Sequence, residues 1–364
     1  MTNKKTNSYF KGRLMRMTLL LLLLSLLSSI APLIPPDDLS IAAFFALLMP
    51  LLQFLNILLF FFWLFLYPTR SLVPLISIAS GYFFYISNFS FYNPNSDQAN
   101  DYAIKVMSYN VRIFNAYSPT INQEKNTTLE MIDWIATHEA DIKCLQEFYN
   151  LDRSEVFNTI KQIALRKNYY FYVNTPEYLR SDKGFFGLII LSKHPIVSAG
   201  TIQIAEKARQ QAIYADVKIN QDTLRIINVH LRSMSIDEEK LTQEIDVEVF
   251  TKLRTGAISR AKQIRTLANF ILNSPYRVIL CGDWNDMPFS YAYQEIKKYL
   301  YNSFEYAGIG VGFTYNGRLF FLRIDNQFFS EGVKVHRFET LRDTKYSDHF
   351  PVVGTYSIAP INPD

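Results

Sequence analysis

The stretch RVILCGDWNDMPFS, residues 277–290, organises the predicted fold of this 364-residue chain. Its apolar residues 278–281 lead into Gly282, and Asp283 and Asn285 follow closely. A short apolar run that ends at glycine predicts a buried strand whose carboxyl end opens into a loop. Since Gly, Asp and Asn are also the ordinary residues of turns, the stretch alone is equally typical of a strand followed by a polar turn.

Other predicted strands share this design, with polar groups close to the end of an apolar run. These groups are Asn110 in IKVMSYNV (104–111), Glu147 in DIKCLQE (141–147), His230 in LRIINVH (224–230), Asp325 in LFFLRIDNQFF (319–329), and Asp348 and His349 in SDHFPVV (347–353). Together with Asp283 and Asn285 they form a set of carboxylates, amides and two histidines without a cysteine cluster. Such a set suits a hard cation such as Mg²⁺, Mn²⁺ or Ca²⁺ and disfavours a zinc site. A cation of this kind, with a histidine paired to an aspartate, can activate water for attack on phosphorus.

Some of these features also have a purely structural explanation. Glu147 closes a buried strand, where a carboxylate either meets a cation or lies at the rim of the sheet. The glycine-rich run GIGVGF (308–313) lacks the strand and helix that frame a phosphate-binding loop, so we expect an ordinary loop. Cys144 and Cys281 lie in apolar runs and are expected to be core residues, with a disulfide as the alternative.

The first 92 residues differ in composition from the rest of the chain. Three stretches, 17–34, 40–67 and 71–92, carry no charge and are rich in apolar residues. A bilayer-spanning helix needs roughly 20 mostly apolar residues, so we expect three transmembrane helices here. The basic residues before the first stretch are also typical of a cleavable signal peptide, but the two later stretches would still hold the chain in a membrane.

The distribution of cations predicts the orientation of these helices. Five basic residues precede the first stretch, and Arg70 separates the second from the third. The loop between the first two stretches instead carries Asp37 and Asp38. Because short loops rich in Lys and Arg stay cytoplasmic, three crossings place everything after residue 92 outside the cytoplasm.

The remaining chain is divided into a linker at 93–101, one large domain at 102–358 and a short tail at 359–364. From Asp101 onward the chain holds 31 of the 37 basic and 30 of the 33 acidic residues, a formal charge of only +1. A dedicated nucleic-acid binder would carry a strong basic excess, so nucleic acid is a possible partner but not the favoured one.

Within this domain the sequence alternates between strand-like and helix-like segments. Helices are expected at 124–138, in most of 236–272 and at 290–300, and the segments 211–219 and 223–230 should form a hairpin. The charges on the longest of these helices are expected to form mostly a solvated face. Alternation of this kind predicts a single core of mixed α and β structure.

The motifs SYNVR, LQE, NVH, GDWND, RID and SDHFP resemble, in this order, those of the endonuclease/exonuclease/phosphatase superfamily. The resemblance extends from about Lys105 to Tyr356. It implies the fold of pancreatic deoxyribonuclease, an α+β four-layer sandwich in which two packed, mostly antiparallel sheets are flanked by helices. Here three transmembrane helices would precede that sandwich.

The resemblance implies a divalent-metal site at the ends of the first strands. Glu147, which ends LQE, would be the principal metal ligand. Asn110 would assist at the same metal or at the phosphate, and Asp348 would belong to a metal site. Mg²⁺ is the expected cofactor, with Mn²⁺ or Ca²⁺ as alternatives.

The resemblance also implies the catalytic groups. Asp283 and Asn285 would orient the attacking water and stabilise the phosphoryl oxygens. His349 would contact the scissile phosphate as a general acid or base, with Asp325 orienting its ring, and His230 would donate a hydrogen bond to the developing negative charge.

The sequence departs from the family pattern, and the lack of nuclease-type loops affects the substrate expected. Asn326 and Gln327 follow RID, where members of the family usually continue the strand with an aromatic or aliphatic residue, and no segment matches the DNA-gripping loops of the nucleases. We therefore expect a metal-dependent phosphodiesterase or phosphatase in a bacterial inner membrane, acting extracytoplasmically on a phosphoester such as a lipid or sugar phosphate. A nuclease, or a catalytically silent binding module on the membrane, remains an alternative, and protein partners are unknown.

Overall fold

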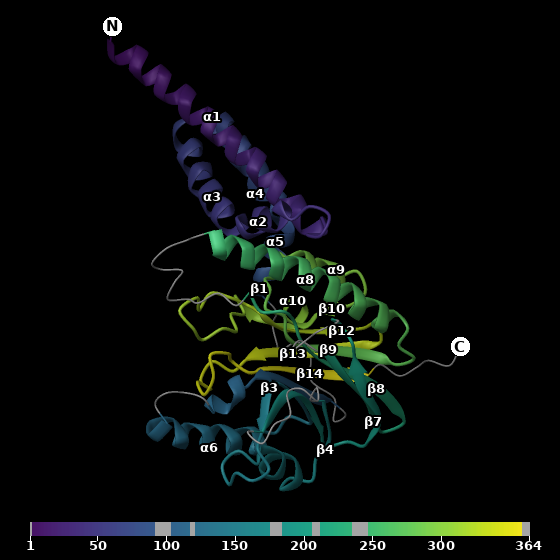
Figure 1. Ribbon diagram of the computed structural model, residues 1–364. Coiled ribbons are helices and arrows are strands. Elements are labelled where there is room, and N and C mark those ends of the chain that lie inside the picture. The colour runs from purple at the N-terminus through teal and green to yellow at the C-terminus, as the bar shows by residue number, and fades with distance from the viewer. Residues whose placement is uncertain are drawn as a thin grey trace, which may run out of the picture.

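The computed structural model describes residues 2–91, 103–116, 121–174, 184–205, 212–234 and 247–358. The predicted linker, the predicted tail and the first part of the predicted helix at 236–272 lie outside these ranges. Two six-stranded sheets occupy the centre of the larger part of the molecule, and helices cover their outer faces (Figure 1).

The first sheet has the strand order β13-β14-β2-β3-β5-β4. Its strands, in chain order, are β2 (Ile104–Asn110), β3 (Ile142–Asn150), β4 (Tyr170–Asn174), β5 (Phe185–Ser192), β13 (Val333–Thr340) and β14 (Val352–Ile358). The central pair β2 and β3 is parallel, and every other pair is antiparallel. Helix α6 (Ile121–Thr137) connects the parallel pair, because parallel strands need a long crossover.

The second sheet repeats this plan with the order β10-β12-β9-β8-β7-β6. Its strands are β6 (Ile196–Ile202), β7 (Ala212–Ile219), β8 (Asp222–His230), β9 (Arg277–Asp283), β10 (Tyr301–Asn302) and β12 (Asp325–Phe329). The parallel pair is β8 and β9, with His230 opposite Asp283, and α8 (Val247–Leu272) connects them. Strands β7 and β8 form the predicted hairpin, turning at Asn220, whose φ is 54°.

The core lies in three layers of apolar side chains. One layer separates the two sheets and includes Val106 and Cys144 from the first and Ile226 and Cys281 from the second. A second layer joins the first sheet to α6, and a third joins the second sheet to α8 and α9 (Tyr291–Ile296). The predicted four-layer sandwich is therefore confirmed. Both cysteines are free and fully buried, as expected for core residues, and burial raises the pKa of the Cys144 thiol.

The predicted start of one strand near the end of the chain was wrong. Only Asp325–Phe329 of the strand expected at 319–329 is extended, whereas the last strand, β14 (Val352–Ile358), follows Asp348 and His349 as expected. The segment 319–322 turns instead, and Thr314 accepts the backbone N–H groups of Ile324 and Asp325. Phe320 and Phe321 of this turn are exposed, and apolar composition alone did not distinguish the turn from a strand.

The expectation of three long apolar helices was also wrong. Within the described ranges, two helical segments are long and apolar enough to cross a membrane, Lys11–Leu33 and Met49–Leu66, the latter being α3. The third stretch forms two shorter helices, α4 (Leu72–Ser80) and α5 (Tyr82–Asn88), because the chain turns at Gly81. The Gln53 side chain occupies the space beside Gly81, where a Cβ atom would lie 2.6 Å from it.

The N-terminal helices form a bundle that stands on the sandwich (Figure 1). Helix α1 (Thr2–Ile30) packs on α3 and α4, whereas α2 (Ile41–Leu47) and α5 lie at the base of the bundle near α8. At this base β1 (Ser90–Phe91) pairs with β11 (Ile309–Gly310).

Polar contacts hold this junction together. Arg265 Nη1 donates to Asp37 Oδ1 at 3.0 Å, and Arg254 Nε donates to Ser40 Oγ at 2.9 Å. The buried guanidinium of Arg323 donates to the backbone carbonyl of Ser87. The N-terminal segment therefore docks on the sandwich through specific contacts of both α8 and the segment before β12.

A substitution at Gly282 tests whether β8 and β9 must approach each other closely at this point. Its φ is +148°, and a Cβ atom there would lie 1.9 Å from the carbonyl oxygen of Val229. We expect Gly282→Ala to destabilise the protein by at least about 3 kcal/mol, because both the backbone conformation and the steric overlap are unfavourable. Gly310→Ala is the matched control, since Gly310 also has a positive φ, of +76°, but no atom lies within 4 Å.

Thermal unfolding of the detergent-solubilised chain, followed by tryptophan fluorescence, measures both variants. The control should lower Tm modestly, since a left-handed residue costs roughly 1–2 kcal/mol. Equal losses for the two alanines would contradict a special closeness of β8 and β9.

Candidate active site

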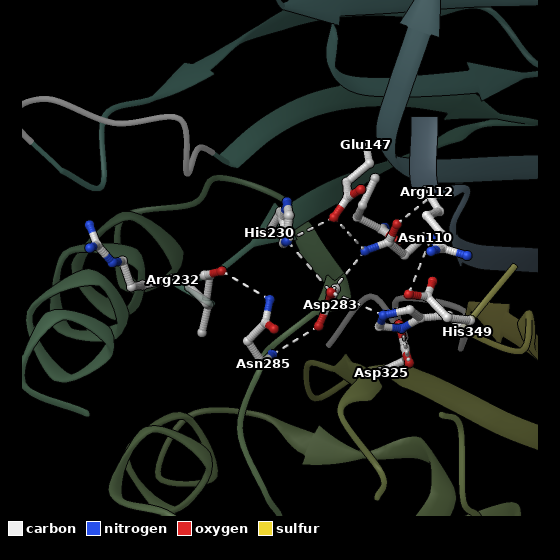
Figure 2. A network of polar contacts seen from close by, with 12 residues as sticks. Asn110, Arg112, Glu147, His230, Arg232, Asp283, Asn285, Asp325 and His349 are labelled. Carbon is white, nitrogen blue, oxygen red and sulfur yellow. Dashed lines mark hydrogen bonds and ion pairs between the residues drawn. The ribbon is translucent and has the colours of Figure 1, made fainter. Parts of the chain in front are cut away.

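Four polar side chains meet where the parallel strands of the two sheets end. Asn110 ends β2, Glu147 lies in β3, His230 ends β8 and Asp283 ends β9. Figure 2 shows all four side chains pointing toward one another. Both parallel pairs direct their carboxyl ends to the same edge of the sandwich, where open sheets commonly bind ligands. The structure thus brings together residues that the sequence had placed on separate strands.

Asn110 links the two carboxylates of this group. Its Nδ2 donates to Asp283 Oδ2 at 2.9 Å and lies 3.3 Å from Glu147 Oε1. Its Oδ1 accepts the backbone N–H of Arg112 at 3.0 Å, which sets the direction of the amide. His230 Nε2 lies 3.5 Å from Asp283 Oδ2 and 3.9 Å from Glu147 Oε1. Two carboxylates from different sheets are therefore held close together by one amide.

A bulge in β3 directs Glu147 to the site. The pairing of β3 with β5 shifts between Leu145 and Phe148, and Glu147 has a φ of 51°. A bulge changes the direction of a side chain that regular alternation would point elsewhere. Gln146, next to it, points into the sandwich, where its Nε2 donates to Asn228 Oδ1 at 2.7 Å. The Glu147 side chain stays 34% exposed, so its carboxylate can meet a ligand from solvent.

The loop after β9 is fixed by hydrogen bonds to its own aspartate and to the end of β8. Asp283 Oδ1 accepts the backbone N–H of Asn285 at 2.9 Å, and Asn285 Nδ2 lies 3.2 Å from the carbonyl oxygen of Leu231. Asn285 has a φ of 49°, a conformation that Asn adopts more readily than most residues. The predicted pair Asp283 and Asn285 therefore lies in a single rigid turn.

His349 and Asp325 form a buried dyad beside Asp283. His349 Nδ1 lies 2.9 Å from Asp325 Oδ2, and His349 Nε2 lies 3.8 Å from Asp283 Oδ2. Tyr315 packs its ring edge-on against the imidazole, with centroids 5.3 Å apart. The structure thus places Asp325 where the sequence expected it, holding one ring nitrogen while the other faces the site.

Charge at this dyad favours the protonated imidazole. Burial by itself would lower the pKa of His349, but Asp325, Asp283 and Asp348 together raise it to about 10. Burial raises the pKa of Asp325, while His349 acts to lower it. Because three carboxylates act on one ring, His349 holds the proton at neutral pH and can donate it from Nε2.

Asp348 lies apart from the other carboxylates. Its Oδ2 is 3.6 Å from Arg112 Nε, and its Oδ1 accepts from Ser347 Oγ at 3.1 Å. Among the described residues, the carboxylates and imidazoles close enough to share one ion are Asp283, Asp325 and His349. Neither Asp348 nor Glu147 belongs to that group.

Supporting residues beneath the site were missing from the sequence-based set. Arg260 on α8 donates from Nε to Asp286 Oδ2 at 2.8 Å and from Nη1 to the carbonyl oxygen of Arg232 at 3.0 Å. Gln263 accepts the backbone N–H of Arg232 at 3.0 Å. Both α8 side chains are buried, so the expectation of a solvated face was wrong for them. The sequence did offer one signal: Arg260 and Gln263 are three residues apart, a spacing that puts two side chains on the same face of a helix.

Carboxylates, amides and a carboxylate-paired imidazole lie together at one edge of a two-sheet sandwich, an arrangement that suits the hydrolysis of phosphoesters. A family model described as "Endonuclease/Exonuclease/phosphatase family" matches residues 107–349, and the chain belongs to that family. Members of this family hydrolyse phosphoesters, and the chain is a hydrolase of this kind. A second model, described only as a domain of unknown function, matches residues 11–89.

Solved structures share the fold at low sequence identity. An endonuclease/exonuclease/phosphatase family protein from Bacteroides thetaiotaomicron is 18% identical, with a TM-score of 0.53, and the match covers 72% of this chain and 100% of that one. A mannosyl-6-phosphatase from the same organism is 18% identical, with a TM-score of 0.52, covering 70% and 100%. The human Nocturnin catalytic domain, with bound sulfate, is 17% identical, with a TM-score of 0.52, covering 72% and 97%. A comparison with curated proteins found no match.

The contact between His349 and Asp325 predicts how turnover changes when the two residues are substituted singly and together. Asp325→Asn removes the charge that orients and stabilises the His349 imidazolium, and His349→Ala removes the acid itself. Each should lower turnover roughly 100- to 10,000-fold, with His349→Ala at least as damaging. Because groups that act as a unit are non-additive, the double variant should be barely slower than His349→Ala.

Turnover at saturating magnesium, with circular dichroism to check folding, measures this cycle. Losses that multiply independently would show that the two side chains do not act as a pair.

Proposed function

We propose that this protein is a divalent-cation-dependent phosphodiesterase or phosphatase that is tethered to a membrane. The observation that carries the proposal is the bridging of Glu147 and Asp283 by Asn110, beside the His349–Asp325 dyad. Two carboxylates that converge from different sheets repel each other, and a bound cation is the usual compensation.

The donor set fits a hard cation. Glu147 offers a partly exposed carboxylate, and Asp283 adds carboxylate oxygen atoms from the other sheet, while the Asn110 amide nitrogen lies between them. Glu147 would hold Mg²⁺, or Mn²⁺ or Ca²⁺, with Asn110 beside it. The contacts given above for Asp348 are with Arg112 and Ser347, and they give its expected metal role no support. When bound, the cation supplies Lewis-acid polarisation of a phosphoryl oxygen.

The other groups would act directly on the water and the phosphate. Asp283, held by the N–H of Asn285, would accept a hydrogen bond from the attacking water, and Asn285 would orient that water. His349 would donate its Nε2 proton to an oxygen of the phosphate, while Asp325 keeps the ring in position. His230, whose Nε2 lies 3.5 Å from Asp283 Oδ2, would donate a hydrogen bond to a phosphoryl oxygen on which negative charge develops.

The N-terminal bundle supports a membrane tether. Its two long apolar segments each reach the length that a bilayer needs. Lys11 Nζ lies 4.7 Å from the ring centroid of Tyr67, and the Arg70 guanidinium lies 4.9 Å from it, so cations of two segments gather at one end. The sandwich stands at the other end (Figure 1). Two crossings alone would return the chain to its starting side, so this topology needs α4 and α5 together to make the third passage. With that passage, cations at a single end favour a cytoplasmic N-terminus and an extracytoplasmic active site.

The metal role of Glu147 can be tested by removing one charge. Glu147→Gln keeps the shape of the side chain, so the fold should survive while magnesium affinity falls at least tenfold. The measurement is turnover as a function of magnesium concentration, with a chelator blank. Glu331→Gln, at an exposed position in the turn before β13, is the matched control. Unchanged turnover of Glu147→Gln at limiting magnesium would contradict its role as a ligand.

The orientation can be tested with reporters. Alkaline phosphatase fused after Asn100 should be active, because that enzyme folds only outside the cytoplasm, and a fluorescent protein at the same position should be dark if exported unfolded. A fusion after Arg70 should give the opposite pair of results. A bright fluorescent-protein fusion and an inactive alkaline phosphatase fusion after Asn100 would place this residue in the cytoplasm and contradict the proposed topology.

A further inference from the structure

Two adjacent phenylalanines are exposed in the turn that precedes β12. Phe320 is 64% exposed and Phe321 is 49% exposed, although the surrounding sequence, LFFLRID, is apolar enough to predict a buried strand. Apolar side chains that are scattered singly over a surface need no explanation, whereas grouped ones mark contact with another protein or with a membrane. The turn is therefore a candidate contact surface.

This turn lies where a candidate membrane span begins. Leu322, the residue after Phe321, packs against a cluster that contains Met49, the first residue of α3. Helix α3 is one of the two described segments that are long and apolar enough to cross a bilayer. Phe84 of α5 packs against the same cluster. The exposed phenylalanines thus lie close to the level at which α3 enters the proposed membrane.

A second segment of the catalytic part exposes a phenylalanine at the same level. Phe250, near the start of α8, is exposed, and its ring centroid lies 5.7 Å from that of Phe44 in α2. An apolar groove between α2 and α8 is lined by Phe250 and also by Leu48, the residue before α3. Figure 1 shows this part of α8 at the base of the bundle. Two separate segments therefore present exposed aromatic side chains beside the start of α3.

The distribution of these side chains favours lipid as the partner. Among the described residues after position 102, Phe250, Phe320 and Phe321 are the exposed phenylalanines, and each lies on a segment that meets the start of α3. A bilayer surrounds a membrane-spanning bundle, so it reaches both segments at once. Arg254 and Arg318 are exposed on the same two segments, and basic side chains close to a membrane attract anionic headgroups.

The turn is also connected to the catalytic dyad. The carbonyl oxygen of Leu322 accepts the backbone N–H of Tyr315 at 3.2 Å. Tyr315 in turn packs its ring on His349 and pairs with it through an isolated backbone bridge. Asp325 follows Phe321 by four residues, which span at most about 14 Å. Contact of this turn with a leaflet would hold the dyad close to the membrane surface.

We propose that Phe250, Phe320 and Phe321 form a membrane-contact surface that enters the lipid leaflet in which α3 begins. This inference rests on the proposed membrane tether and goes beyond it, because it gives the catalytic part a contact with lipid of its own. The membrane-contact surface holds the active site beside the headgroups of that leaflet.

The depth of single labelled positions in a bilayer tests this surface. Cys144 and Cys281 are fully buried, so an added exposed cysteine is the reactive one. Phe250→Cys, Phe320→Cys and Phe321→Cys are each made in the full chain, labelled with a nitrobenzoxadiazole fluorophore and placed in vesicles of phosphatidylcholine and phosphatidylglycerol. The phosphatidylcholine carries a nitroxide quencher on its acyl chain, either near the headgroup or near the terminal methyl group.

The expected quenching differs with position. At the three phenylalanine positions the shallow nitroxide should quench at least twofold more strongly than the deep one, since interfacial side chains enter only about 5–10 Å. Leu58→Cys, exposed in the middle of α3, should show the reverse. Leu165→Cys should be quenched by neither, because it lies in η5 (Ile160–Leu165), which packs with α6 at the end of the sandwich far from the bundle (Figure 1).

A charge placed in the turn tests whether its aromatic side chains make the contact. Phe321→Asp should reduce shallow quenching of the label on Phe320→Cys at least twofold, because a carboxylate is costly to move into an apolar medium. Tyr170→Asp, at an exposed aromatic position of β4, is the matched control and should leave this quenching unchanged. Circular dichroism checks that both variants keep the fold.

The outcomes separate this inference from the membrane tether. Quenching at Leu58→Cys without quenching at the phenylalanine positions would overturn the membrane-contact surface and leave the tether standing. Blue-shifted emission at those positions that neither nitroxide quenches would also overturn it, because protein rather than lipid would then cover the turn. Absence of quenching at every position would overturn the tether and the inference together. Hydrolysis is not measured here, so none of these results depends on the proposed activity.

Discussion

The hydrogen bond from Asn110 Nδ2 to Asp283 Oδ2, at 2.9 Å, is the contact on which the site depends. It joins β2 of one sheet to β9 of the other across 173 residues of sequence. It can form only if the two sheets stack with their parallel pairs facing and their carboxyl ends at one edge. The core between the sheets, in which Cys144 and Cys281 are both buried, fixes that stacking. The active-site geometry is therefore a consequence of how the sandwich packs.

The positions of the active-site side chains require backbone conformations of unfavourable energy. Glu147 and Asn285 both have positive φ angles, and such residues typically cost about 1–3 kcal/mol each. Buried hydrogen bonds around them over-determine the conformation. Gln146 reaches Asn228, and Asn228 in turn donates to the carbonyl oxygens of two strands of the first sheet. Strain that is held this firmly orients side chains before any ligand arrives.

The N-terminal segment is part of the same framework. Met49 packs with Met287, Phe289 and Ile324, on the two segments that carry Asn285 and Asp325. The Arg323 guanidinium, two residues before Asp325, binds the carbonyl oxygen of Ser87. Contacts of this kind restrict the distance and angle between the bundle and the site. A flexible tether would leave both free, so this arrangement suits chemistry at a fixed height above a surface.

The sequence by itself determined the strands and most of the site, because an apolar run with a polar end is a local pattern. Asn110, Glu147, His230 and Asp283 were placed at strand ends from such runs, and parallel pairing brings these ends together. Tertiary structure alone decided that Gly81 interrupts the third apolar stretch, that Arg260 is buried against Asp286, and that Asp348 meets Arg112. Those outcomes depend on partners far away in the chain, since burial of a charge is stable only where another segment supplies its counter-charge. Hydrophobic periodicity carries no information about such partners.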